Sequence, residues 1–119
     1  MSTLEHFDSN PRLSRVVVHN DLAWLSGIVA ADCSQCIEGQ TRQILQRLDQ
    51  LLADVGSSRE RLLSVQLWMS DMNGDFATMN TVWTDWLDGA AAPARATAQV
   101  VFDDPDIRLE LIATAACQA

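Results

Sequence analysis

An arginine and a glutamate in the last quarter of the chain carry the side chains best suited to chemistry on a small acid. Arg95 lies near the start of the apolar run 94–102, two residues after Pro93, and Glu110 lies within the run 107–113. A planar guanidinium binds a carboxylate through two parallel hydrogen bonds, and a carboxylate beside an electrophilic carbon can accept a proton from water. The pair suits binding and hydrolysis of a small carboxylic acid, and a solvated or ion-paired sheet face is the competing interpretation.

The two apolar runs predict a β-hairpin that closes at Asp103–Asp106, where proline and aspartate favour a turn. On the register that pairs Phe102 with Ile107, side-chain alternation points Arg95 and Glu110 to the same face of the sheet. Four residues along the ladder separate them by roughly 13 Å. The gap needs either a bulge or a contribution from a neighbouring subunit, and the sequence leaves both open.

Four other stretches have strand patterns. A short edge strand is predicted over 4–7, and a hairpin pairs 16–19 with 22–26 around Asn20-Asp21. Residues 62–70 alternate between apolar and polar, with one apolar face that we expect to lie under a helix. The residues predicted for that face are Leu63, Val65, Leu67 and Met69.

Two stretches have the apolar spacing of amphipathic helices. The first covers 31–55, with Asp32 as the predicted N-cap and Gly56 as the residue that ends it. The second begins after Asp71 or Asn73 and ends at Gly89. This order of elements predicts an α+β fold, in which one mixed sheet carries both helices on the same face.

The predicted sheet has a second face that no helix of the chain covers. Trp24 and Trp68 are large apolar side chains expected in strands. An exposed apolar face on a single small domain favours burial by self-association. We therefore expect a homo-oligomer.

Length and charge limit the remaining possibilities. The 119 residues predict a single domain over 1–119, and sixteen acidic residues against eight basic ones give a formal net charge of -8. That charge repels phosphate backbones and anionic membranes, so no nucleic-acid partner is expected. No apolar run reaches about 18 residues, so no membrane span is expected, and the N-terminus lacks signal-peptide features. The predicted location is cytoplasmic.

Four motifs, in this order along 12–115, resemble the RidA (YjgF) family, which is also labelled the endoribonuclease L-PSP family. The motifs are Leu25-Ser26-Gly27, the stretch Asp75-Phe76-Ala77-Thr78-Met79-Asn80, Pro93-Ala94-Arg95 and Leu109-Glu110-Leu111. The family consists of small trimeric enamine/imine deaminases. The resemblance implies a chorismate-mutase-like fold, a homotrimer, and sites at the boundaries between subunits.

The resemblance also assigns roles to five residues. Arg95 matches the arginine that binds the substrate carboxylate, and Glu110 matches the glutamate that positions or activates the hydrolytic water. Ser26, Gly27 and Thr97 match positions that contact the substrate. The implied reaction converts 2-aminoacrylate-like enamines and small 2-imino acids to 2-keto acids and ammonia, with no metal or organic cofactor.

The chain departs from the family pattern in the pocket wall. It contains no tyrosine, and Leu13 falls near the place of the tyrosine that the best-known members carry. Thr97 replaces a cysteine of those members. A non-catalytic trimer that binds small carboxylates is therefore the alternative function. A third is redox or metal chemistry at Cys33 and Cys36, where a helix start can lower a thiol pKa.

Overall fold

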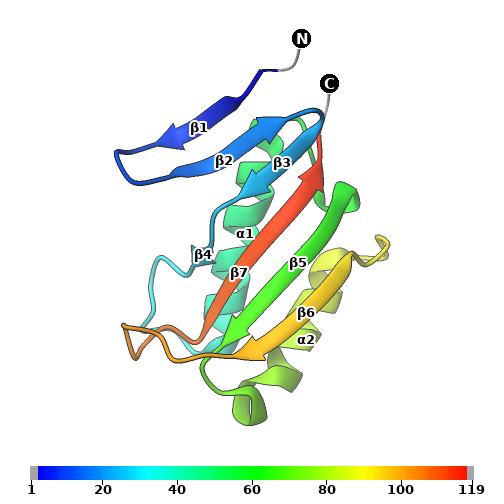
Figure 1. Cartoon of the computed structure of the whole chain (residues 1–119). Coiled ribbons are helices and arrows are strands. Elements are labelled where there is room, and N and C mark those ends of the chain that lie inside the picture. The colour runs from blue at the N-terminus through cyan, green and yellow to red at the C-terminus, as the bar shows by residue number, and fades with distance from the viewer. Residues whose placement is uncertain (1–2, 118–119) are drawn as a thin grey trace.

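The computed structural model describes residues 3–117, which form a seven-stranded mixed sheet with two helices on one face (Figure 1). The strands are β1 (Glu5–Ser9), β2 (Ser14–His19), β3 (Leu22–Leu25), β4 (Ile28–Val29), β5 (Leu62–Met69), β6 (Ala94–Gln99) and β7 (Leu109–Ala116). The helices are α1 (Ile37–Asp54) and α2 (Met72–Leu87), with a 3-10 turn at Arg59–Arg61. The predicted α+β class, with both helices on the same side, is confirmed.

The sheet order is β1-β2-β3-β7-β5-β6, with β4 also paired to β7. The first hairpin is confirmed: β2 pairs with β3 through a turn in which Asn20 and Asp21 have φ of 52° and 66°. Two residues with positive φ give the turn that matches the twist of a hairpin, and asparagine and aspartate tolerate that conformation. None of the helices formed by residues 3–117 has both the length and the apolar character that a membrane crossing requires.

The C-terminal hairpin predicted from the sequence is wrong. β5 lies between β6 and β7, pairing in parallel with β6 and antiparallel with β7. The physical reason is the sixteen-residue helix α2 between β5 and β6. Such a crossover returns the chain in its original direction, so β6 runs alongside β5 instead of folding back on β7. Residues 100–108 then pass the end of β5 to reach the middle of the sheet (Figure 1).

The start of the first helix, α1, differs from the predicted start. α1 begins at Ile37 because Asp32 closes a separate turn, in which its carboxylate accepts hydrogen bonds from the backbone and hydroxyl of Ser34. Asp32 is therefore not the N-cap of α1. The cap of α2 is Asp71, which accepts a hydrogen bond from the Gly74 backbone. That helix ends with positive φ at Asp88 and at Gly89, as expected of a left-handed C-cap.

The apolar core lies between the sheet and the two helices. Val65, Leu67 and Met69 of β5 are buried there as predicted, but Leu63 is 47% exposed. A shift in the pairing of β5 with β7 between Leu62 and Ser64 turns Leu62 inward in its place.

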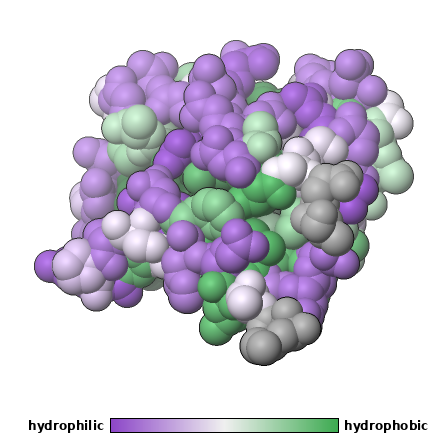
Figure 2. Space-filling model, turned by 90° about the horizontal axis from the view of Figure 1, so that it is seen from above, coloured by the Kyte–Doolittle hydropathy of each residue, from purple (hydrophilic) through white to green (hydrophobic). Residues whose placement is uncertain are grey.

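The other face of the sheet carries no helix and lies toward the viewer in Figure 1. Trp24 is 51% exposed and Trp68 is 36% exposed on this open face. Seen from above, apolar side chains also reach the middle of a largely hydrophilic surface (Figure 2). The prediction that one sheet face is left uncovered is confirmed for the part of the chain the structure describes.

Candidate functional site

Glu110 lies near the start of β7 on the open face of the sheet. It pairs with Trp68 of β5 on one side and with Val29 of β4 on the other. Paired residues of a sheet point to the same side, so the Glu110 carboxylate projects beside the exposed Trp68. The sheet therefore holds this carboxylate at a fixed place on the surface that lacks helices.

Gly27 lies against Glu110 in the link between β3 and β4. A Cβ atom at this position would overlap the carboxylate oxygen of Glu110, so only glycine allows the approach. The preceding residue, Ser26, donates its backbone N–H to the carbonyl of Arg15 at 3.0 Å. Its hydroxyl oxygen is buried and has no hydrogen-bond partner among residues 3–117. Gly27 contacts Glu110, and Ser26 directly precedes Gly27 in the chain. We call these three predicted site residues the Glu110 cluster (Ser26, Gly27 and Glu110).

Arg95 and Thr97 lie on the opposite side of the sheet. In β6 they pair with Val65 and Leu67 of β5, which are both buried under the helices. The guanidinium carbon of Arg95 lies 5.9 Å from the ring centroid of Phe76. It also lies 5.8 Å from the ring of Trp83, another residue of α2. The predicted common face for Arg95 and Glu110 is therefore wrong, because β5 separates their strands and sets a different register.

The surroundings of Arg95 test the competing interpretation that this arginine forms an ion pair within the chain. Among residues 3–117, no carboxylate lies within 4.0 Å of its guanidinium, while four other arginines have such a partner. The pairing of β5 with β6 is regular over all six residue pairs, so no bulge turns Arg95 toward the open face. Within one chain, the described structure leaves the guanidinium available to an anion and does not bring it to Glu110.

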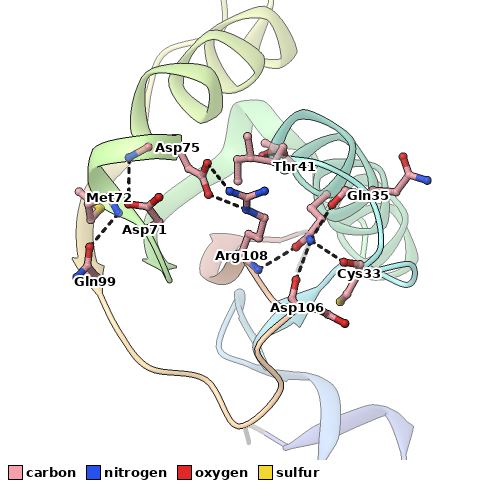
Figure 3. Close-up of polar contacts among 12 residues, drawn as sticks. Cys33, Gln35, Thr41, Asp71, Met72, Asp75, Gln99, Asp106 and Arg108 are labelled. Atoms are coloured by element: carbon pink, nitrogen blue, oxygen red, sulfur yellow. Dashed lines mark hydrogen bonds and ion pairs between the residues drawn. The ribbon is translucent and has the colours of Figure 1, made fainter.

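A buried polar network, which sequence reasoning missed, fixes the start of β7 (Figure 3). The carboxylate of Asp75, only 3% exposed, accepts two hydrogen bonds from Arg108, at 2.9 Å from Nε and 3.1 Å from Nη2. Gln40 is fully buried, and its Oε1 accepts the backbone N–H of Arg108 at 3.0 Å. Its Nε2 lies 2.9–3.1 Å from the carbonyl oxygens of three residues in two loops: Cys33, Gln35 and Asp106.

The network joins both helices to the strand that carries Glu110, because Arg108 precedes Glu110 by two residues. A signal for it exists in the sequence. Gln40 and Thr41 stand three and four residues after Ile37, at positions that belong to the apolar face of the helix. A polar residue at such a position predicts a buried hydrogen-bonded contact.

Cys33 does not have the environment of a reactive thiol. Burial raises the pKa of the Cys33 thiol, and the carboxylates of Asp104, Asp106 and Asp32 raise it further. The lowered pKa that a helix start suggested for this region is therefore wrong for Cys33. Among residues 3–117, no group of three or more histidine, cysteine, aspartate or glutamate side chains is placed to hold a metal ion.

The fold and these contacts define a small α+β protein whose polar groups gather on both faces of one mixed sheet. The family model described as Endoribonuclease L-PSP matches residues 3–117. A RutC family protein from Haemophilus influenzae is 34% identical over 116 residues, 97% of this chain and 99% of that protein. The RutC family protein YoaB from Escherichia coli is 32% identical over 114 residues, 96% of this chain and 98% of that protein.

Solved structures agree with the sequence relatives. A member of the YjgF protein family from Neisseria meningitidis superposes with a TM-score of 0.93 at 33% identity, over 98% of this chain and 97% of that one. An uncharacterized protein from Pseudomonas aeruginosa has the same TM-score at 37% identity, over 98% of this chain and all of that one. The chain belongs to this family, the RidA (YjgF) or L-PSP family that its motifs resemble.

Proposed function

We propose that this chain hydrolyses small 2-imino acids and 2-aminoacrylate-like enamines at sites shared between the subunits of a homotrimer. Arg95 of one subunit binds the substrate carboxylate, and the Glu110 cluster of its neighbour acts on the carbon–nitrogen double bond. The observation that carries the proposal is the placement of the two groups on opposite faces of the sheet. Each group is incomplete among residues 3–117: the Arg95 guanidinium has no carboxylate partner, and the buried Ser26 hydroxyl has no hydrogen-bond partner.

The reaction needs only water and the side chains already described. An enamine first tautomerises to its imine, and water then attacks the imine carbon. Glu110 accepts one proton from that water and passes it to the imine nitrogen, which gives a carbinolamine with a hydroxyl and an amino group on the same carbon. Transfer of the hydroxyl proton to the amino nitrogen then breaks the carbon–nitrogen bond, so that ammonia leaves and the 2-keto acid forms. The Arg95 guanidinium holds the carboxylate in a fixed orientation, so that the imine carbon meets the water beside Glu110.

The open sheet face supports the proposed trimer. The chain has a net charge of -8, yet this face exposes the large apolar side chains of Trp24 and Trp68. Neither of the two helices in the described structure covers this face (Figure 1). Large aromatic side chains on such a surface favour an interface. Light scattering should give three times 13.1 kDa, and a monomer would contradict the proposal.

A coupled assay tests the reaction. An amino-acid oxidase or a dehydratase generates the imine or enamine in place, and the purified chain should accelerate release of the keto acid. Glu110→Gln should lower the rate by about 10²- to 10⁴-fold, the usual contribution of a general base, while ligand binding is retained. If no small 2-imino acid is hydrolysed faster than in buffer, the catalytic proposal fails.

The changed pocket wall favours a second candidate, a trimer that binds small carboxylates without turnover. The chain has no tyrosine, and Thr97 stands where the best-known members carry a cysteine. Under this alternative, a keto acid binds through Arg95, but Glu110→Gln has no activity to remove. The same coupled assay, run beside a calorimetric binding measurement, separates the two functions.

A further inference from the structure

A cavity with a volume of about 290 Å³ lies beside Gly27. It opens to solvent between β2, the Gly27–Ala31 segment and α1, and its lining residues are Arg15, Gly27–Ala31, Gln43, Arg47 and Leu51. Because Gly27 also lies against the Glu110 carboxylate, the cavity borders the Glu110 cluster. It is separate from the polar pocket at Arg108 and from the one at Trp68.

The charged residues that line this cavity are two arginines, Arg15 and Arg47, and no aspartate or glutamate lines it. That is unexpected in a chain with sixteen acidic residues and eight basic ones. Arg15 is half-buried, yet no carboxylate among residues 3–117 lies within 4.0 Å of its guanidinium. A partly desolvated charge without a partner is costly, so an anion in this cavity would stabilise it.

Two further side chains add donors to the cavity. Arg47 contacts Asp8 through a single nitrogen, Nη2, at 3.1 Å, and this pair is exposed to solvent. Such a surface pair is worth little and leaves most of the guanidinium donors of Arg47 available. Gln43 uses its Oε1 to accept the backbone N–H of Asp32 at 3.0 Å, which leaves the amide N–H groups as donors.

The remaining lining is apolar, contributed by Ile28, Val29, Ala30, Ala31 and Leu51. Small-molecule sites combine such walls with a few polar groups that fix orientation, and their volumes start at about 300 Å³. The cavity therefore suits a short hydrocarbon chain that ends in an anionic group.

We propose that this cavity receives the far carboxylate of the substrate, so that the preferred substrates are dicarboxylic 2-imino acids. The inference rests on the proposed function. The carboxylate next to the imine binds Arg95 of one subunit, and the imine carbon lies beside Glu110 of the other. The side chain of the substrate then extends past Gly27, and its terminal carboxylate binds Arg15.

Binding of stable keto acids tests this without depending on turnover. Calorimetry compares 2-oxoglutarate, a dicarboxylate, with 2-oxobutyrate, a monocarboxylate, on the wild-type chain. We expect 2-oxoglutarate to bind at least about tenfold more tightly, a difference of about 1.4 kcal/mol. Arg15→Gln should abolish this preference. Arg12→Gln is the matched control, since Arg12 is exposed, carries the same charge three residues away and does not line the cavity.

The outcomes separate this proposal from the one on which it rests. Equal affinity for the two acids in the wild-type chain, or a preference that survives in Arg15→Gln, overturns the cavity assignment and leaves the deaminase proposal standing. Equal loss of the preference in Arg12→Gln also overturns it, because general electrostatics would then explain the effect. Failure of both acids to bind, or binding that is unchanged in Arg95→Ala, overturns the proposed function and this inference together.

Discussion

At the scale of single residues, the contact of Gly27 with Glu110 predicts that a side chain at position 27 displaces the Glu110 carboxylate and lowers the catalytic rate. Gly27→Ala places a methyl group where the Glu110 carboxylate now lies, and the flexible carboxylate must move aside. We expect a loss of activity on the order of 10²-fold, the effect of misplacing a reacting group by about 1 Å, with the fold retained. The kcat of the coupled reaction and the thermal midpoint, Tm, are the measurements.

Gly39→Ala is the control for this substitution. A Cβ at Gly39 would lie 2.9 Å from the Cβ of Gln35, so the start of α1 must shift slightly, while alanine favours a helix over glycine by about 0.5–1 kcal/mol. This variant should keep the wild-type kcat even if Tm changes. Full activity in Gly27→Ala would show that the position of Glu110 is not critical.

Arg95 gives a second prediction at this scale. A lysine keeps the charge but lacks the planar pair of donors, so Arg95→Lys should lose most of the affinity for 2-oxobutyrate and Arg95→Ala nearly all of it. A buried charge-assisted pair is worth about 2–5 kcal/mol, which is a loss of tens- to thousands-fold in Kd. Calorimetry measures both variants, and circular dichroism checks that they remain folded. Unchanged binding in Arg95→Ala would refute the role of Arg95 as carboxylate anchor.

At the scale of secondary-structure elements, the network around Gln40 should hold α1, α2 and β7 together. Gln40→Leu removes the partner of the Arg108 backbone N–H and of carbonyls in both loops. Each buried polar group left without a partner costs about 1–3 kcal/mol. We expect a large fall in the urea midpoint. Gln46→Leu, an exposed residue on the same helix, should change it little, and equal effects of the two would argue against the network.

The elements also show what the sequence could and could not predict. Periodicity located both helices and the N-terminal hairpin, because the face that each element buries leaves a regular apolar pattern. It could not reveal that β6 pairs with β5, since strand pairing depends on the direction in which the crossover helix returns the chain. The strand–helix–strand order over 62–99 could have indicated that β6 pairs with β5. The aspartates at 103–106, however, favoured a turn and therefore a hairpin of β6 with β7. Arg95 was therefore assigned to the wrong face of the sheet.

At the scale of the whole molecule, the division of the site between two faces predicts complementation between inactive variants. Arg95→Ala damages only one half of each site, and Glu110→Gln damages only the other. If both halves came from one chain, a mixture of the two variants could contain no intact site. If they come from neighbouring subunits, a site is intact wherever a Glu110→Gln subunit supplies Arg95 to a neighbour that keeps Glu110.

Random exchange of the two variants in equal amounts should therefore restore about one quarter of the wild-type activity in a closed ring of identical contacts. The mixture is denatured, refolded together and assayed for keto-acid release. Each variant refolded alone is the control and should remain at its own low rate. Light scattering on the same samples confirms that trimers have formed. A refolded mixture no more active than the average of its parents would place Arg95 and Glu110 of each site in the same subunit, or in no common site at all.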